Sequence, residues 1–296
     1  MLDSRNKIAD REIYSNQRVG VDTVSYLQAI ILGIVQGLTE FLPVSSSGHL
    51  VLFESLFRIN EPTLAFEIFL HLGTLIAVFA AFWQEIVLLI CSVIKMLRKP
   101  MQIPQLVKAD GGCRLVVMLI VATIPIVIVG LWLQDWITQL FRDPKVTGLM
   151  LIVTGTLLYL SSRVSRGKKN LEQIRYADAL FIGSGQALAV LPGLSRSGTT
   201  IAAGLLRGIE RENAARFSFL LSIPAVLGSQ VLAIKDVLTL PTGSVSIGVM
   251  ATGTVAAAIT GYLAIKLLIN FVRRGKLTIF AYYTWCIGLL VVLFNM

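Results

Sequence analysis

The sequence predicts an all-α integral membrane protein, and three observations carry that prediction. Of its 296 residues 55% are hydrophobic and 15% are charged, with a mean hydropathy of +0.76. The apolar residues form blocks long enough to cross the hydrocarbon core, which takes about 20 residues per helix. The chain lacks the short alternating pattern of barrel strands. Because only helices and closed barrels satisfy the backbone in lipid, helices follow.

Six apolar blocks are the predicted transmembrane helices. They cover about 64–95, 113–133, 146–162, 214–234, 245–269 and 277–295. Residues 1–22 are polar with balanced charge, and no A-x-A cleavage site follows the first apolar block. We therefore expect a polar N-terminal tail rather than a cleaved signal peptide, followed by a single membrane domain over residues 23–296.

Two further apolar segments are interrupted. The segment at about 24–57 breaks at Pro43–Gly48, and the segment at about 177–208 breaks at Pro192–Gly198. Neither arm of either segment comfortably crosses a bilayer, and proline and glycine lie where a helix has to stop. Both segments are predicted to be re-entrant helical hairpins, which enter the membrane, break near its middle and return to the same side.

The two hairpins are copies of each other. A shift of 150 positions aligns, without a gap, Gly33 with Gly183, Gln36 with Gln186, Leu38 with Leu188, Ser45 with Ser195, Ser47 with Ser197 and Gly48 with Gly198. Repeat one covers about 24–162 and repeat two about 177–295, each with one hairpin and three spans. An odd number of crossings reverses the second half, which predicts the inverted-topology repeat found in many transporters.

The positive charge of the chain favours a membrane orientation over a nucleic-acid partner. The formal net charge is +9, but the basic residues lie in short loops between apolar blocks. Since loop Lys and Arg mark the cytoplasmic side, we place 98–114, 163–175 and 273–276 in the cytoplasm and the balanced segments 134–145 and 235–244 outside. Both termini are then external, and the hairpin tips meet in the interior.

The two breaks have the chemistry of an anion site. A helix that starts at a break points free backbone N–H groups and the positive end of its dipole at it. Arg196 adds a guanidinium, which is costly in a membrane without an anion and whose planar fork suits phosphate oxygens. The other predicted diphosphate-binding residues of the breaks are Ser45, Ser47, Gly48, Ser195, Ser197, Gly198 and Thr200.

Binding alone does not require the Glu, Ser and His of the first break. If a helix begins at Ser45 or Ser46, His49 lies one turn after Ser46 on the same face. A hydroxyl beside an imidazole is the arrangement of an activated nucleophile, with His49 moving the protons. Glu40, with Gln36 one turn before it, is expected to orient His49 or to hold a divalent cation.

Three other polar residues in apolar blocks are weaker candidates. His71 lies alone among leucines and is interpreted as a packing residue. Glu54 and Glu67 are interpreted as structural carboxylates, because a carboxylate in a membrane segment often serves only to pair or cap. The constellation in the breaks is more specific than any of its members.

The stretches QGLTEFLPVSSSGH, from Gln36 to His49, and PGLSRSGTT, from Pro192 to Thr200, resemble the two signatures of the BacA-type undecaprenyl-diphosphate phosphatases. The resemblance covers nearly the whole chain from about residue 24. It implies hydrolysis of the polyprenyl diphosphate carrier to monophosphate and phosphate, which recycles the carrier for peptidoglycan synthesis. It also implies resistance to the antibiotic bacitracin, which sequesters that diphosphate.

Carried over by position, the resemblance implies a catalytic set and a binding set. The catalytic set is Glu40, Ser46, His49 and Arg196, and Gln36 joins the diphosphate-binding residues of the breaks. Gln36 is a variant that the family pattern allows, which puts Glu40 forward as the essential acid. Ser47 stands where relatives can carry Thr. The expected location is the bacterial plasma (inner) membrane, with the site facing the external side.

The sequence leaves several alternatives open. Ser46 attacks the terminal phosphorus, or a Mg²⁺ or Ca²⁺ ion at Glu40 activates water; no organic cofactor is expected. A flippase or secondary transporter for an anionic lipid or phosphate compound is the rival function, because inverted repeats with broken helices are typical of transporters. The expected partners are the lipid substrate and membrane lipid without nucleic acid, and a homodimer is left open.

Overall fold

A computed structural model describes residues 24–57, 59, 64–133, 140, 143–164, 167–239 and 246–294. The predicted tail at 1–22 and parts of the two predicted external segments lie outside these residues. Within them the fold is all-helical, with an isolated bridge between Lys169 and Ile209 as the one β-type pairing. The α-helices are α2 (Tyr26–Phe41), α3 (Ser46–Leu56), α4 (Leu64–Ala81), α5 (Trp83–Arg98), α6 (Ile103–Ala109), α7 (Gly111–Trp132), α9 (Pro144–Arg163), α10 (Tyr176–Leu188), α11 (Arg196–Leu206), α12 (Arg211–Thr239), α13 (Ile247–Arg273) and α14 (Thr278–Phe294).

Four of these helices are long and apolar enough to cross a membrane. They are α7, α9, the Arg211–Val231 part of α12, and α13. The bent pair α4 and α5 raises the number of candidate spans to five, while α14 is a shorter apolar helix of 17 residues. A multi-pass helical membrane protein is therefore confirmed.

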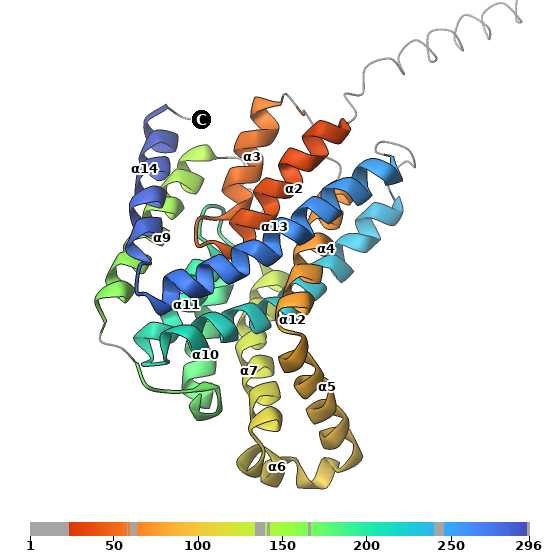
Figure 1. The fold of residues 1–296 in the computed structure, drawn as a ribbon, viewed down its shortest axis with the longest axis vertical. Coiled ribbons are helices and arrows are strands. Elements are labelled where there is room, and N and C mark those ends of the chain that lie inside the picture. The colour runs from red at the N-terminus through yellow and green to blue at the C-terminus, as the bar shows by residue number, and fades with distance from the viewer. Residues whose placement is uncertain are drawn as a thin grey trace, which may run out of the picture.

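The predicted span at 64–95 is not one continuous helix. It is two helices, α4 and α5, bent by 87° at Phe82. Neither proline nor glycine marks this bend, so the apolar composition gave no sign of it. Phe82 is buried, and its ring packs 5.7 Å from that of Phe219 on α12. Beyond the bend α5 packs on α7, and α5, α6 and the start of α7 form the lower end of Figure 1.

Both predicted breaks are present, and each joins two helices that pack on each other. Helix α2 ends at Phe41 and α3 begins at Ser46, while α10 ends at Leu188 and α11 begins at Arg196. Figure 1 shows α3 returning beside α2. Proline stops the first helix because it has no N–H to donate and clashes with the preceding turn.

The two helical hairpins pack in a similar way, each against a long helix of the other predicted repeat. Helix α2 of the first repeat lies along α13 of the second, and α10 of the second lies along α7 of the first. Equivalent glycines permit both contacts. A Cβ on Gly33 would lie 2.5 Å from the carbonyl oxygen of Gly253, and a Cβ on Gly183 would lie 2.2 Å from that of Ala122. Small residues allow this close approach of membrane helices.

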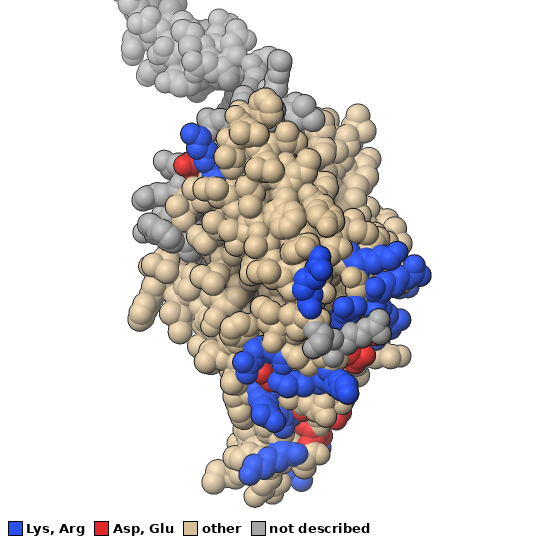
Figure 2. Space-filling view, turned by 90° about the vertical axis from the view of Figure 1, so that its left-hand side faces the viewer, with Lys and Arg blue, Asp and Glu red and all other residues tan. Residues whose placement is uncertain are grey.

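Charge is distributed unevenly over the face drawn in Figure 2. On this face most Lys and Arg side chains lie in the lower half of the molecule, and few lie in the upper half. The lower end carries α5, α6 and the start of α7, so the basic loop at 98–114 belongs to this charged end.

Candidate active site

The two breaks meet inside the helix bundle. Ser197 Oγ of the second break donates to the carbonyl oxygen of Leu42 in the first, at 3.4 Å. A Cβ added to Gly198 would lie 3.2 Å from Cβ of Pro43, so glycine lets the two turns touch. The cavity between them has a volume of about 170 Å³. It is lined by Thr39, Glu40, Ser45, Ser46, Ser47, His71, Ala189, Leu194, Ser195 and Arg196.

The serines of the two breaks repeat the same local geometry. Ser45 Oγ lies 3.3 Å from Ser47 Oγ, and Ser195 Oγ lies 3.2 Å from Ser197 Oγ. The second break is the more regular, because Ser195 caps α11 by accepting from the N–H of Gly198 at 3.1 Å. Ser45 instead adopts a left-handed backbone conformation, with φ of 71°, which is uncommon outside glycine and costs energy.

Helix α9 holds the second break in place. The Thr154 hydroxyl accepts from the backbone N–H of Ser195 at 3.0 Å and lies 3.2 Å from the carbonyl oxygen of Gly193. Gly193 has φ of +88°, and a Cβ there would lie 2.1 Å from the carbonyl oxygen of Thr147. Glycine is required at this position for both its backbone conformation and its contact with α9.

Glu40 is the hub of the polar contacts in the cavity. Its Oε1 accepts from Arg196 Nη2 at 2.5 Å, which joins the two breaks through an ion pair. Its Oε2 accepts from Ser46 Oγ at 2.8 Å and from Gln36 Nε2 at 3.2 Å. Its side chain is only 8% exposed. A buried carboxylate of this kind stays charged because these donors compensate its lost hydration.

One guanidinium nitrogen of Arg196 has no hydrogen-bond acceptor within the described chain. Its Nη1 is buried and has no hydrogen-bond partner among the described residues, while Nη2 is held by Glu40. Buried polar groups are rarely left without partners, so an unpaired guanidinium nitrogen indicates a missing acceptor. An anion in the cavity would be that acceptor.

His49 does not contact Ser46 in this structure, in contrast to our expectation. One ring nitrogen, Nδ1, lies 2.8 Å from the carbonyl oxygen of Ser45, and Nε2 lies 2.7 Å from Tyr283 Oη. The ring is buried and stacks on Tyr283, with centroids 5.7 Å apart. Helical spacing placed the two residues on one face, but the ring turns to α14. The partner of the Ser46 hydroxyl is Glu40.

His71 lies in the cavity, although the sequence indicated a packing residue. Its Nδ1 lies 3.0 Å from Gln36 Nε2 and 3.9 Å from Glu40 Oε2, and its side chain is 33% exposed. The signal that could have identified it was its presence on an apolar segment, since an ionisable residue inside a membrane is a functional candidate by default.

Three other predicted residues lie behind the cavity lining. The Thr200 hydroxyl is 2.6 Å from Ser218 Oγ and donates to the carbonyl oxygen of Arg196, so it braces the first turn of α11. Gly48 faces Thr147 of α9, and Gly198 faces Pro43. These residues shape the breaks from behind the polar surface, in positions where they do not contact the cavity directly.

The cavity does not fit a metal ion held by the protein alone. In the part of the chain that the structure describes, no three His, Cys, Asp or Glu side chains converge on one point. Among the described residues Glu40 is the single carboxylate that lines the cavity, and both its oxygens already accept hydrogen bonds. A closed divalent-cation site uses more oxygen ligands than this.

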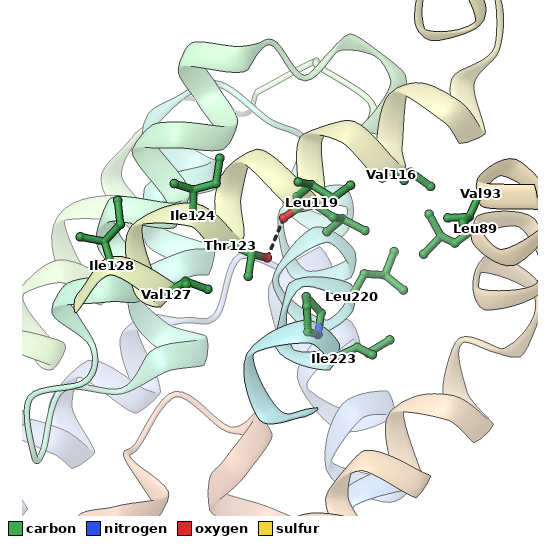
Figure 3. A pocket seen from close by; sticks show the side chains of 12 residues that line it. Leu89, Val93, Val116, Leu119, Thr123, Ile124, Val127, Ile128, Leu220 and Ile223 are labelled. Atoms are coloured by element: carbon green, nitrogen blue, oxygen red, sulfur yellow. Dashed lines mark hydrogen bonds between the residues drawn. The ribbon is translucent and has the colours of Figure 1, made fainter. Parts of the chain in front are cut away.

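Larger grooves lie on the apolar surface. One, of about 470 Å³, lies between α5, α7 and α12, and Figure 3 shows its aliphatic lining. Its one polar side chain, Thr123, donates to the carbonyl oxygen of Leu119. A second groove, of about 560 Å³, lies between α7 and α10 and ends at residues 187–191, which flank Ala189 of the polar cavity. Neither groove offers groups for a diphosphate.

Comparison with known proteins decides the family. The model of the family described as bacitracin resistance protein BacA matches residues 29–290. The chain belongs to this family. Among relatives of this BacA-family chain, the undecaprenyl-diphosphatase of Desulforapulum autotrophicum is 46% identical over 269 residues, which cover 90% of this chain and 97% of the relative. The undecaprenyl-diphosphatase of Methanobrevibacter smithii is 46% identical over 268 residues, which cover 90% of this chain and 96% of the relative.

A third relative is similar over the same part of the chain. The undecaprenyl-diphosphatase of Halothermothrix orenii is 42% identical over 266 residues, which cover 90% of this BacA-family chain and 96% of the relative. The matched span contains both breaks and every residue that lines the cavity. The resemblance that the two serine-rich motifs indicated is therefore confirmed.

Proposed function

We propose that this BacA-family protein hydrolyses undecaprenyl diphosphate to undecaprenyl phosphate and inorganic phosphate. The observation that carries the proposal is the buried, unpaired Nη1 of Arg196, at a cavity where the Ser46 hydroxyl donates to a carboxylate. The named activity of the relatives supports it. Hydrolysis regenerates the lipid carrier for peptidoglycan synthesis, and it lowers the amount of diphosphate available to bacitracin.

The cavity is suited to phosphoryl transfer because its positive groups are fixed in advance. Such transfer depends mainly on positioning and on stabilising charge at the phosphate oxygens. Helices α3 and α11 begin at the cavity, and their free N–H groups and dipoles favour an anion. Arg196 adds a full charge, and Ser45, Ser47 and Ser195 add hydroxyl donors.

Ser46 is our candidate nucleophile and Glu40 its base. A bond forms between Ser46 Oγ and the terminal phosphorus while the anhydride P–O bond breaks, and the bond electrons leave with the prenyl monophosphate. The hydroxyl proton passes to Glu40 Oε2, which lies 2.8 Å away. Water then hydrolyses the phosphoserine. His49, which we expected in the role of base, is held by Tyr283 and serves in this proposal to position α3.

A divalent cation enters this proposal only together with the substrate. Mg²⁺ is commonly held by one or two carboxylates and the phosphate oxygens of a substrate. Glu40 would be the one protein carboxylate available to a Mg²⁺ or Ca²⁺ ion, which would neutralise phosphate charge. A cation-activated water is the alternative to attack by Ser46.

We place the protein in the bacterial plasma membrane, with six crossings, two re-entrant hairpins and the site open to the external side. The unequal charge of the two ends of the fold supports this orientation. The prenyl tail would leave the cavity past residues 187–191 and follow the apolar groove between α7 and α10. The apolar tail would then lie on apolar side chains, and the diphosphate would lie in the polar cavity.

A lipid flippase or transporter is the competing function, because the inverted repeat and broken helices fit it as well. Phosphate release by purified protein in detergent separates the two, since transport needs a membrane and hydrolysis does not. Wild type should release phosphate from undecaprenyl diphosphate. Ser46→Ala and Arg196→Ala should each lose at least about 100-fold in kcat/KM, the effect of removing a main catalytic group.

The matched control is Ser229→Ala, a change at an exposed serine of α12. It should behave as wild type. Phosphate release by Ser46→Ala at the wild-type rate would exclude the phosphoserine and leave activation of water by Glu40. No release by the wild type in any detergent or lipid would overturn the proposed hydrolysis.

A further inference from the structure

We propose that His71 binds the diphosphate as a neutral hydrogen-bond donor through Nε2–H, and that Gln36 fixes it in that form. The inference deepens the proposed function and rests on it. His71 comes from α4, so it adds a third element to a site otherwise built from the two breaks.

The argument begins at Glu40, which determines how the Gln36 amide is turned. A charged carboxylate only accepts hydrogen bonds, so the group of Gln36 that faces Glu40 Oε2 at 3.2 Å is the NH₂. The opposite orientation would place two oxygens together. The Gln36 Oε1 is consequently buried without a partner among the described residues. The two contacts of the NH₂ group, with Glu40 and with His71, fix the amide in this orientation.

The second hydrogen of the same NH₂ determines the tautomer of His71. Gln36 Nε2 lies 3.0 Å from His71 Nδ1, and one of the two must accept. The Nε2 of Gln36 can only donate, so the Nδ1 of His71 accepts. The proton of the imidazole ring therefore resides on the Nε2 of His71. The hydrogen bonds that connect Arg196, Glu40, Gln36 and His71 thus leave the imidazole neutral, with one N–H available to donate to a ligand.

His71 lines the cavity, and Gln36 occupies its Nδ1, so the N–H left for a ligand is the one on Nε2. The His71 side chain is 33% exposed, compared with 8% for Glu40 and 16% for Arg196. Among the residues that the structure describes, Nε2 has no hydrogen-bond partner. A phosphate oxygen bound by Arg196 and the serines is the acceptor within the same cavity.

Two conservative substitutions separate this role from a structural one. The amide NH₂ of glutamine reaches the position of Nε2, whereas the shorter asparagine amide reaches that of Nδ1. His71→Gln should therefore keep kcat/KM within about threefold of wild type, while His71→Asn and His71→Leu should lose about 10- to 100-fold, the effect of a lost hydrogen bond to a charged group. If only the contact between His71 and Gln36 mattered, His71→Asn would keep the wild-type kcat/KM and His71→Gln would not.

Inorganic pyrophosphate provides a readout that is independent of hydrolysis. It should raise the unfolding temperature of wild type and His71→Gln in detergent, and should do so less for His71→Asn and His71→Leu, because a ligand stabilises the protein that binds it. Leu72→Ala, at an exposed neighbour on α4, is the matched control and should follow wild type. Unfolding temperatures without ligand identify any variant that simply folds poorly.

The outcomes distinguish the two proposals. If wild type hydrolyses the lipid and His71→Leu equals it in both assays, the role of His71 is overturned and the proposed function stands. If wild type releases no phosphate, but pyrophosphate still raises the unfolding temperature of His71→Gln more than that of His71→Asn, the proposed function fails and the donor role of His71 stands. If wild type neither releases phosphate nor binds pyrophosphate, both are overturned.

Discussion

The carboxylate of Glu40 and the guanidinium of Arg196 lie 156 positions apart in the sequence and 2.5 Å apart in the fold. Each lies in a different break; the Glu40 side chain is 8% exposed and that of Arg196 is 16% exposed. Neither charge would be stable alone at that depth, since an unpaired buried charge carries a large desolvation cost. The ion pair therefore assembles the site and makes each half depend on the other.

A double-mutant cycle tests this dependence. Arg196→Met alone should lower the free energy of unfolding by about 3–5 kcal/mol, because it leaves Glu40 charged and unpaired. The double variant Glu40→Gln, Arg196→Met should recover part of that stability but none of the activity. Unfolding in detergent measures the first effect and phosphate release the second. Additive losses of stability would show that the two side chains are not coupled.

The contact between His49 and Tyr283 yields a prediction about roles. Tyr283→Phe removes the partner of a buried ring nitrogen, so it should cost about 1–3 kcal/mol of stability while kcat stays near the wild-type value. Tyr282→Phe, at an exposed neighbour, should change neither quantity. A large loss of kcat with unchanged stability would instead bring His49 into the chemistry.

The equivalent glycines of the two repeats should respond alike. Gly33→Ala and Gly183→Ala each push a methyl group against a backbone carbonyl of another helix, and overpacking of this kind typically costs about 1–3 kcal/mol. Gly130→Ala is the matched control, since a Cβ there meets nothing within 4 Å. Thermal unfolding of the three variants provides the comparison. Equal stability of all three would contradict the close helix contacts.

At Ser45, whose backbone is left-handed, glycine should stabilise the protein relative to alanine. Glycine adopts a φ of 71° without steric cost, so Ser45→Gly should be more stable than Ser45→Ala by about 1 kcal/mol. Both variants lose the contact with Ser47, which makes the comparison a test of the backbone alone. Ser195→Gly against Ser195→Ala, where the backbone is extended, should lack this advantage.

The sequence predicted the parts of the site whose signals are local. Proline, glycine and serine marked both breaks, and the duplication predicted that Glu40 and Arg196 would belong to one site. What it could not predict depended on tertiary packing. The bend at Phe82 has no breaker residue and is associated with a ring on α12. The partner of His49 lies 234 positions away on α14, so helical spacing alone pointed to Ser46 instead.

The packing of α2 against α13, and of α10 against α7, has a consequence for biogenesis. Helix α2 leaves the ribosome well before its partner α13, because the two belong to different repeats. Until the second repeat has been synthesised, Glu40 therefore lacks Arg196 and keeps only its contacts with Ser46 and Gln36. The cavity is lined by both breaks, so the first hairpin has no complete site during that interval.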